Sequence, residues 1–465
     1  MFKTMKRAIL LFIILFQSGF SNGQCWQNVS AGGSHTIAIR TGGSLWSWGR
    51  NNLGQLGTAG IPSTSSNSPI QIGNASDWLV ISAGSSHSVA IKTNGTLWTW
   101  GWNSFGQLGD NSTNNSTIPI QIGTDNDWAF ISAGDKYTLA LKTNGTLWGW
   151  GDNEYGQLGD GTSGAGNKIL IPTPIGVATW SFVSAGSDHS LAIKTDGTLW
   201  AWGRNNNGKL GNGSTTDSYM PTQISALTNW QTVLAAQSHS VARKTDGSVW
   251  TWGDNTNGQL GDGTSGVSAY KTLPINVGSM SISTTIAKGF QHTIVRKNDG
   301  KLYSWGGNAS GQLGDGTNTQ QNNPVTVNND TDWLLVDSKA THTTALKTDG
   351  TLWTWGSNLY GQLGNASFSA QNTPQLITCP TLASETFSIS DRIKIYPNPV
   401  TNFVNVEFLD NIKIQKIIIT DLFGKTLIEK SEMTNEFNLE NLTTGIYFLQ
   451  IYSSEGNYQT KLIKN

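Results

Sequence analysis

The residue types that most often carry chemistry recur in this chain at a fixed spacing. The sequence contains repeats of about 50 residues, and all six histidines occupy the same position in their repeats: His35, His87, His189, His239, His292 and His342. In the one remaining repeat, Tyr137 occupies this position. A metal site or a proton relay needs such side chains to converge on one ligand. Equivalent positions of separate repeats are held apart, so we interpret these residues as structural groups that hydrogen-bond to nearby backbone.

Two loops combine Asp, Asn and Gly in a way that suggests a calcium site, at residues 152–161 (DNEYGQLGDG) and 254–263 (DNTNGQLGDG). The acidic residue that closes an EF-hand-type loop is missing, and Gly-Gln-Leu-Gly recurs along the chain, so turn-forming Asx residues are the better interpretation. No nucleophile, metal cluster or phosphate loop stands out. The sequence therefore predicts no enzyme, no metal and no cofactor.

Tryptophan is unusually frequent, with 20 among 465 residues. Thirteen belong to W-x-W pairs, in which Tyr303 replaces the one missing member, and a further six open the repeats: Trp26, Trp78, Trp128, Trp180, Trp230 and Trp333. Only Trp102 falls outside this register. A buried aromatic side chain hides about 150–250 Å² of surface. We therefore predict that the tryptophans in register pack the core and do not bind ligands.

The second tryptophan of each pair defines seven repeats of 50 to 53 residues: Trp48, Trp100, Trp150, Trp202, Trp252, Trp305 and Trp355. A turn signal ending in glycine precedes each pair, as at Asn94-Gly95, where both residues of a two-residue hairpin turn must tolerate positive φ. Apolar residues alternate with polar ones on both sides of the turn, which indicates strands. Seven such repeats predict an all-β fold, a seven-bladed β-propeller with one blade per repeat.

The pattern GxxHS followed by DGTLWTWGxNxxGQLG resembles the repeat of the regulator of chromosome condensation family, whose members form seven-bladed propellers. The match covers residues 26 to about 378, and all seven copies keep Trp-Gly and G-[QK]-L-G, with Lys209 in the fourth. The endings typical of WD40 and kelch blades are missing. Plant photoreceptor relatives use clustered tryptophans with arginines, whereas the tryptophans here follow the scaffold register.

The N-terminus predicts an exported protein. Residues 1–23 combine Lys3, Lys6 and Arg7 with a short apolar core and small residues before Gln24, as in a cleaved signal peptide. No later segment reaches the roughly 18 apolar residues of a membrane span, so we expect no transmembrane segment in the mature chain. A net charge of -1 with 13% charged residues argues against nucleic acid as a partner.

A linker at residues 380–391 separates the predicted propeller, residues 24–379, from a tail at 392–465. The tail reads as short alternating strands, which predicts a small Ig-like β-sandwich. Its segments IYPNP, TDLFGK and TTGIYFLQI resemble the C-terminal sorting domain of type IX secretion cargo. The resemblance implies that the type IX machinery exports the chain through this tail, which is then removed as the protein is released or attached to the cell surface.

The only two cysteines, Cys25 and Cys379, bracket the predicted propeller. A ring of blades brings its two ends together, and export favours oxidation, so we predict a disulfide between them. In the chain-entropy model, closing a loop of this length stabilises the fold by roughly 5–6 kcal/mol at most.

Departures from the repeat template indicate a binding surface. The residue after Trp-Gly varies: Arg50, Trp102, Asp152, Arg204, Asp254, Gly307 and Ser357. The residue three positions later also varies: Leu53, Phe105, Tyr155, Asn207, Asn257, Ser310 and Tyr360. Since the last repeat neighbours the first in a closed ring, we predict one ligand-binding surface, called the aromatic arc: Arg50, Leu53, Trp102, Phe105, Tyr155 and Tyr360. The alternative is that these side chains fold back against neighbouring blades.

The predicted function is that of a secreted or cell-surface, non-enzymatic propeller that binds another macromolecule, with a protein as the first choice. The alternative is a carbohydrate-binding or adhesive module whose ligand is a surface polysaccharide, a role that aromatic platforms would also suit. An enzyme is the third interpretation.

Overall fold

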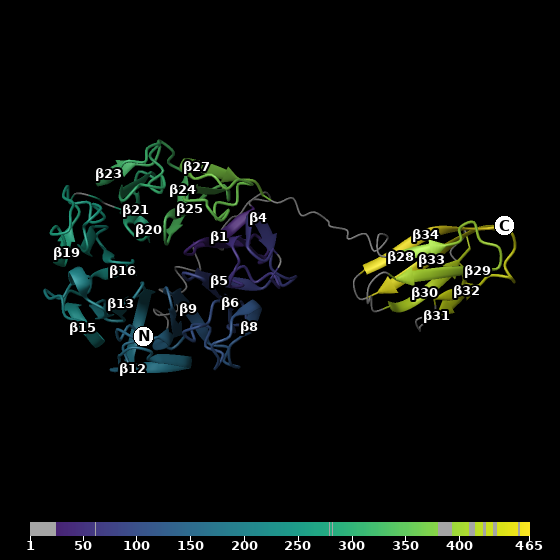
Figure 1. Cartoon of the computed structure of the whole chain (residues 1–465), viewed down its shortest axis with the longest axis horizontal. Coiled ribbons are helices and arrows are strands. Elements are labelled where there is room, and N and C mark those ends of the chain that lie inside the picture. Colours follow the sequence, from purple (N-terminus) through teal and green to yellow (C-terminus); the bar gives the residue numbers. More distant parts are fainter. Residues whose placement is uncertain are drawn as a thin grey trace. The chain divides into compact units, whose positions relative to one another are not determined.

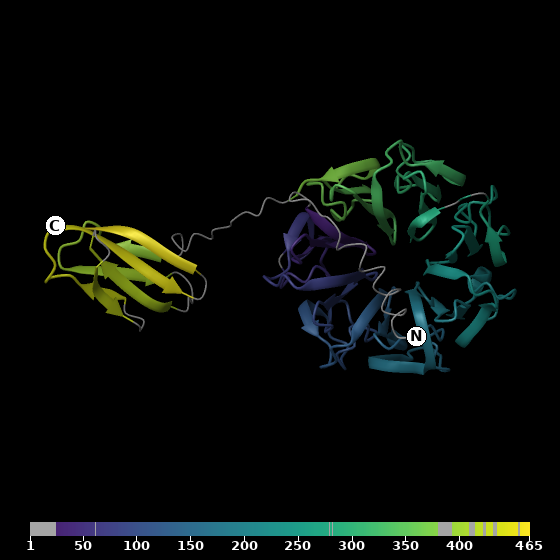
Figure 2. The same ribbon diagram turned by 180° about the vertical axis from the view of Figure 1, so that it is seen from behind.

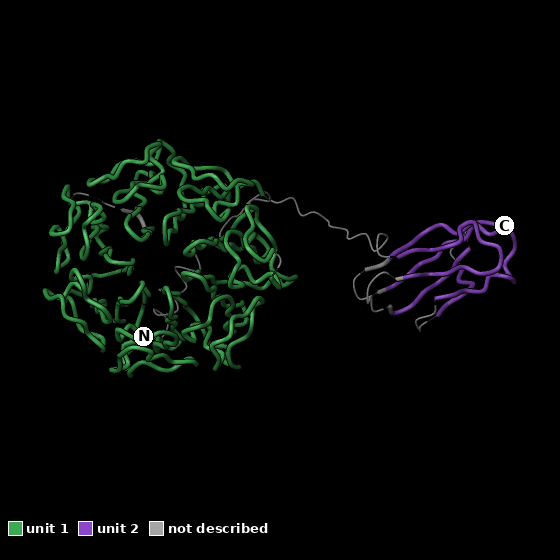
Figure 3. Tube along the Cα trace, viewed as in Figure 1, with its two compact units in different colours: residues 1–379 green, residues 380–465 purple. Residues whose placement is uncertain are grey.

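The computed structural model describes residues 25–60, 62–278, 280, 282–379, 393–408, 414–421, 425–430, 435–453 and 456–465. The chain divides after Cys379 into two compact units (Figure 3). Over the described residues the secondary structure consists of β-strands and one short 3₁₀ turn, η1 (Asn206–Gly208), which confirms the predicted all-β class. None of these residues belongs to a helix long and apolar enough to cross a membrane. The predicted signal peptide (1–23) and linker (380–391) lie outside the described ranges.

Each repeat of the first unit contributes four successive antiparallel strand segments. The first strands are β1 (Trp26–Ala31), β5 (Trp78–Ala83), β9 (Trp128–Ala133), β16 (Trp230–Ala235), β20 (Ile282–Lys288) and β24 (Trp333–Ser338). The second strands are β2 (His35–Arg40), β6 (His87–Lys92), β10 (Tyr137–Lys142), β13 (His189–Lys194), β17 (His239–Lys244), β21 (His292–Lys297) and β25 (His342–Lys347). The third strands are β3 (Leu45–Arg50), β7 (Leu97–Gly101), β11 (Thr146–Asp152), β14 (Leu199–Gly203), β18 (Val249–Gly253), β22 (Leu302–Gly306) and β26 (Leu352–Gly356). The fourth strands are β4 (Ser65–Gln71), β8 (Ser116–Gln121), β15 (Ser218–Ser225), β19 (Lys271–Asn276), β23 (Gln321–Thr326) and β27 (Gln371–Ile377).

The long strand β12 (Lys168–Ala185) belongs to two repeats. Its first part pairs with β11 and its last part pairs with β13, which joins the third and fourth repeats into one seven-stranded sheet. The other repeats form separate four-stranded sheets in chain order, such as β1-β2-β3-β4. The sheets follow one another around a ring with their first strands innermost (Figures 1 and 2), and β24 contacts β1.

The hairpins lie where the sequence places them, but the predicted two-residue turn is wrong in its backbone. In the second repeat, Gly95 donates to the carbonyl of Lys92 and Lys92 donates to the carbonyl of Thr96, at 2.9 and 3.1 Å. Only Gly95 has a positive φ, of 80°, and Asn94 does not. This is a three-residue loop that ends in a left-handed glycine, a common alternative to the two-residue turn. Among these hairpin turns, only that of the first repeat has two residues with positive φ, Gly42 and Gly43.

Neighbouring sheets are joined by a recurring set of hydrogen bonds that we call the seam joint. Between the first and second repeats, the carbonyl of Gln55 accepts from the indole Nε1–H of Trp100 and from the hydroxyl of Ser88, both at 3.0 Å. The Ser88 oxygen also lies 2.9 Å from Nε2 of His35. Because the single hydroxyl proton goes to Gln55, Nε2 of His35 carries a proton and donates it to Ser88.

The seam joint recurs around the ring. The tryptophan and its acceptor carbonyl are Trp100 with Gln55, Trp150 with Gln107, Trp202 with Gln157, Trp252 with Lys209, Trp305 with Gln259, Trp355 with Gln312 and Trp48 with Gln362. At the last of these, the hydroxyl of Thr36 also donates to Gln362 at 2.9 Å and accepts from His342 at 3.1 Å. The two ends of the first unit are therefore joined by the same chemistry as every other seam.

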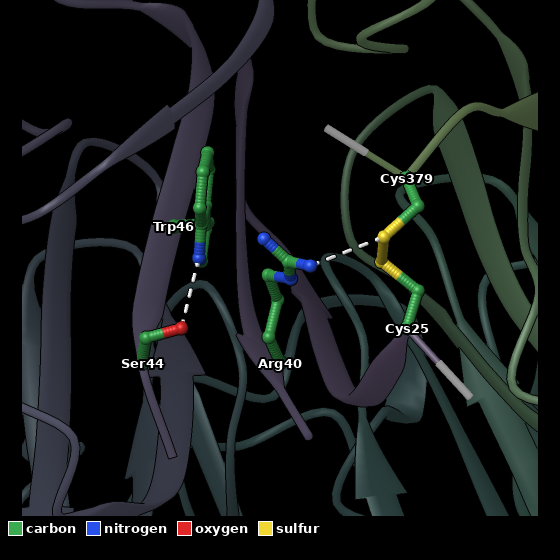
Figure 4. Close-up of a disulfide and its surroundings, with 5 residues drawn as sticks. All are labelled: Cys25, Arg40, Ser44, Trp46 and Cys379. Atoms are coloured by element: carbon green, nitrogen blue, oxygen red, sulfur yellow. Dashed lines mark hydrogen bonds between the residues drawn. A yellow bond between two sulfur atoms is a disulfide. The ribbon is translucent and has the colours of Figure 1, made fainter. Parts of the chain in front are cut away.

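The same two ends are also joined covalently. Cys25 precedes β1 and Cys379 follows β27, and the two form a disulfide with their Cα atoms 5.8 Å apart (Figure 4). The predicted pairing is thus present in the structure.

The second unit contains two sheets that share one apolar core. One sheet has the order β28 (Ile393–Tyr396), β29 (Phe403–Phe408), β32 (Glu436–Asn438), and the other has the order β31 (Thr426–Lys430), β30 (Ile414–Thr420), β33 (Gly445–Ser453), β34 (Gly456–Lys464). Val404 and Val406 of β29 are buried with Ile417 and Ile419 of β30.

Burial keeps the histidines of the seam joints uncharged. The Nδ1 atom of each histidine is buried and has no hydrogen-bond partner within the described ranges. Burial, helped by nearby charged or ionisable groups, lowers the pKa of His35 and of His239 to about 3. Burial alone lowers the pKa of His342 to about 4. Protonation would place a charge at a site without an acceptor.

We expect acid to destabilise the ring steeply. A histidine in the unfolded chain has a pKa of about 6.5, so below that pH the unfolded state binds more protons than the folded state, and the free energy of unfolding falls as the pH falls. Each buried histidine removes about 1.4 kcal/mol per pH unit from about pH 6 down to its folded pKa. Urea unfolding at pH 7, 6 and 5 measures this slope. The variant His87→Tyr copies Tyr137 and should reduce the slope by one histidine's share, whereas a free energy that is constant from pH 7 to 5 would contradict the argument.

Candidate functional site

One end of the ring carries all the long loops. The loops between first and second strands and those between third and fourth strands leave the sheets at the same end, which we call the loop face. The backbone links them, because the N–H of Arg50 donates to the carbonyl of Ser34 and the N–H of Trp102 donates to that of Ser86, at 2.8 and 2.9 Å. The aromatic arc lies on this face.

The glutamine of Gly-Gln-Leu-Gly sets the backbone position of the arc. Oε1 of Gln55 accepts from the N–H of Leu53 at 2.9 Å, and the equivalent glutamines hold Phe105, Tyr155 and Tyr360 in the same way. These four residues therefore occupy equivalent places on successive repeats. In the fourth repeat Lys209 cannot accept such a bond, and the loop instead forms η1, with Asn207 at a φ of 57°.

Cations from the following repeat cover three rings of the arc. Arg50 lies over the ring of Tyr360, with 4.6 Å from its guanidinium carbon to the ring centroid. The guanidinium of Arg204 lies over Tyr155 at 4.5 Å, and the ammonium of Lys136 lies over Phe105 at 4.4 Å. Such stacking is favourable because the face of an aromatic ring carries negative charge.

The arc residues are all half-buried, and the structure brings some of them directly together. Arg50 contacts Tyr360, and Trp102 meets Phe105 edge to face with 5.2 Å between centroids. The indole Nε1–H of Trp102 donates to the Ser104 hydroxyl at 2.8 Å. Because cations occupy several ring faces, a ligand would meet ring edges and the outward N–H groups of the cations.

A compensated charge pair ends this row of contacts in the fourth repeat. Asp188 replaces the residue that is serine in three other repeats, and Lys209 replaces the glutamine of the template. The Asp188 carboxylate pairs with the buried ammonium of Lys209 and accepts from Nη1 of Arg204 at 3.2 Å. Burial lowers the pKa of Lys209, and Asp188 opposes that shift. Asp188 thereby helps to hold Arg204 over Tyr155.

Sequence reasoning missed a second group of charges, at the ends of the inner strands and just beyond them, which we call the axis charges. Lys288, Asp337 and Lys339 replace residues of the Ser-Ala-Gly template, and Asp135 follows that tripeptide in the third repeat. Nζ of Lys339, in the seventh repeat, donates to the carbonyls of Ala133 and Gly134 in the third repeat at 2.6 and 3.0 Å. Nζ of Lys288 similarly contacts the carbonyl of Ala185 at 3.4 Å. These bonds join repeats that are not neighbours, so the two lysines span the middle of the ring.

The environment of these lysines is unfavourable to positive charge. Burial and the charge of Lys288 lower the pKa of Lys339 to about 7, while Asp135 and Asp337 act in the opposite direction. Asp337 also accepts from the backbone N–H of Ala31 at 2.9 Å. The two lysines among the axis charges thus join repeats that are not neighbours.

The loops that suggest calcium form Asx turns. Oδ1 of Asp152 accepts from the N–H of Glu154, and Oδ1 of Asp160 accepts from Nδ2 of Asn153, at 3.2 and 2.9 Å. Within the described ranges, no three His, Cys, Asp or Glu side chains lie close enough together to hold a metal ion.

Sequence comparison places the two units in known families. The RCC1-like domain model matches residues 13–339, and regulator of chromosome condensation repeat models match residues 335–362 and 349–388. The secretion system C-terminal sorting domain model matches residues 394–465.

The curated proteins to which the chain is similar include a plant receptor and a large human ligase. The ultraviolet-B receptor UVR8 of Arabidopsis thaliana is 31% identical over 308 residues, which cover 64% of this chain and 69% of UVR8. The human E3 ubiquitin-protein ligase HERC2 is 31% identical over 301 residues, but these make up only 5% of that protein.

Solved structures share the fold at low identity. Yeast RCC1 (Prp20) bound to Kap60 superposes with a TM-score of 0.65 at 19% identity, over 75% of this chain and 84% of that one. Human WBSCR16 gives a TM-score of 0.65 at 20% identity, over 72% of this chain and 94% of its own.

We predict that Asp188→Ser alone is strongly destabilising, because it leaves the buried Lys209 ammonium without its carboxylate. Breaking a buried pair in this way costs about 3–5 kcal/mol. The double variant Asp188→Ser/Lys209→Gln restores the repeat template at both positions and should recover most of that loss. Denaturant unfolding of the two variants and the wild type measures the difference. Equal free energies of unfolding for the single and double variants would contradict this assignment.

Proposed function

The chain belongs to the RCC1-like domain family, and on that premise we propose that residues 24–379 form a seven-bladed propeller that binds a protein partner through its loop face. In this arrangement β12 supplies the outer strand of the third blade and the inner strand of the fourth. The proposal extends to binding without catalysis, because the histidines are uncharged and engaged in the seam joints.

The C-terminal sorting domain indicates export by type IX secretion and attachment at the cell surface. We propose that residues 1–23 are a cleaved signal peptide, that 380–391 form a linker, and that 392–465 form an Ig-like sandwich read by the type IX machinery. The binding partner would then be met outside the cell.

The observation that carries the proposal is that cationic side chains are stacked on the aromatic rings of the arc. Arg50 and Arg204 are stacked on tyrosines of the preceding repeat, so their side chains are ordered before any partner arrives. Pre-ordered side chains lose little entropy on binding. Arg, Tyr and Trp are also the residues that most often dominate binding energy at protein interfaces, which favours a partner with carboxylates and backbone carbonyls.

Relatives support a protein as the ligand. Structures of yeast RCC1 are described in terms of its complex with Kap60 and its binding to Gsp1p and histones. These structures are 19% and 20% identical to this chain and share its fold.

A surface polysaccharide is the second candidate ligand. Trp102 is the one tryptophan outside the scaffold register, and its ring is half-exposed on the loop face. Aromatic rings of this kind can pack against sugar rings.

We expect the double variant Trp102→Ala/Tyr155→Ala to lose at least tenfold in affinity for the partner, because it removes the ring under Arg204 and the half-buried indole of Trp102. The partner is first identified by capture on the immobilised full-length chain from outer-membrane and medium proteins, in parallel with a polysaccharide panel, and affinities are then measured by calorimetry. The matched control, Asn257→Ala/Ser310→Ala, alters equivalent loop positions outside the arc and should change affinity less than twofold.

Equal affinities for the arc variant and the control would refute the arc as the binding surface. Retention of a polysaccharide alone, lost in the arc variant, would replace the protein partner with the second candidate.

A further inference from the structure

A cation-carboxylate pair recurs at the end of the sheets opposite the loop face. In three repeats the last residue of the second strand is a lysine that pairs with the aspartate directly before the first tryptophan. The pairs are Lys92 with Asp77 at 3.0 Å, Lys142 with Asp127 at 3.0 Å and Lys347 with Asp332 at 3.1 Å. Each lysine also lies over that tryptophan, at 4.8 to 5.0 Å.

The first repeat also has a strand-end cation over a tryptophan ring, but the cation and its partner are different residues. Arg40 takes the place of the lysine and lies over Trp46 at 5.2 Å, while Cys25 directly precedes Trp26, in the place of the aspartate. Nη2 of Arg40 donates to Sγ of Cys379 at 3.3 Å, as Figure 4 shows. A disulfide sulfur has therefore replaced a carboxylate as the partner of a strand-end cation.

The surroundings of this disulfide suit a developing negative charge. Nη1 of Arg40 is buried and has no hydrogen-bond partner in the part of the chain that the structure describes, so no carboxylate competes with Cys379 for this terminal nitrogen of the guanidinium. Cys379 is exposed and Cys25 is half-buried, so both sulfur atoms belong to residues that solvent reaches.

We propose that the Cys25–Cys379 disulfide is a thiol-exchange site that accepts the thiolate of a small thiol or of a cysteine on another protein. The incoming thiolate attacks Sγ of Cys25 and forms a new S–S bond there. The Cys25–Cys379 bond breaks, and its electron pair leaves on Sγ of Cys379 as a thiolate. A second thiolate then attacks the bound thiol's sulfur, which releases Cys25 as a thiolate and the external pair as a disulfide.

Arg40 has the role of stabilising the leaving thiolate. Exchange is faster when the leaving thiol is more acidic, and a neighbouring cation favours the thiolate form. Reduction removes only the covalent link, because the seam joint at Gln362 and the bond from the N–H of Trp26 to the carbonyl of Gly350 remain. Exchange therefore removes the covalent link between the two ends of the first unit while their hydrogen bonds remain.

The first test compares reduction rates in the oxidised full-length chain. Dithiothreitol is added at pH 7, and free thiols are counted over time by alkylation and mass spectrometry. We expect Arg40→Gln to slow reduction by about threefold or more, the effect of about one unit in leaving-thiol acidity. Arg40→Lys should retain most of the rate, and the matched control Lys92→Gln should not change it. Equal rates for wild type and Arg40→Gln would overturn the proposal.

A second test does not depend on the folding of an Arg40 variant. In Cys25→Ser the thiol of Cys379 is free, and its rate of alkylation by iodoacetamide is followed as a function of pH. We expect half-maximal reactivity at a lower pH in the folded protein than in the same protein unfolded in urea. Coincident profiles would show that Arg40 does not favour the thiolate, and would refute the proposed site.

Discussion

The ring depends on one backbone carbonyl per repeat, that of the residue between glycine and leucine in Gly-Gln-Leu-Gly. It accepts an indole N–H and a hydroxyl from the next repeat, and the hydroxyl in turn receives the histidine proton where a histidine is present. A buried carbonyl of this kind costs free energy unless it is paired. The final glycine of the motif is required as well, since a Cβ at Gly57 would lie 2.8 Å from Nε1 of Trp100.

The loop-face residues can vary between repeats because they do not take part in the seam joints. The seam joints lie between neighbouring repeats and involve backbone groups and buried side chains, so residues such as Arg50 and Trp102 can change without breaking them. The fourth repeat shows what happens when the motif itself changes. Lys209 keeps its carbonyl in the seam joint but loses the glutamine side chain, and Asp188 compensates its charge.

Much of the fold could be predicted because its signals are local and repeated. Strand alternation, turn glycines and the 50-residue period fixed the all-β class, and the position of Cys25 and Cys379 at the two ends predicted their pairing. The prediction of a two-residue turn was wrong because Asn-Gly is compatible with both a two-residue and a three-residue loop. Only the pairing of Lys92 with Thr96 distinguishes the two.

The site was harder to predict because its partners lie in other repeats. The positions of Phe105 and Tyr155 followed from the repeat register, but Lys136 stacks on Phe105 from the loop before Tyr137, a position that the comparison of repeats did not include. Lys288 and Lys339 were missed because their hydrogen-bond partners lie in repeats that are even further away along the chain. Lys339 bonds to a carbonyl 206 residues away, and no periodic signal connects the two positions.

The continuous strand β12 makes the connection between the third and fourth repeats different from the connections between other repeats, and this difference matters for engineering. Between other consecutive repeats, such as the first and second, a non-strand linker at residues 72–77 connects two separate sheets, and new chain ends could be opened there for circular permutation or for inserting a second domain. Between the third and fourth repeats the same cut would sever a strand that is hydrogen-bonded on both sides. A split version of this protein should therefore keep residues 168–185 intact and treat the two repeats that share them as a single piece.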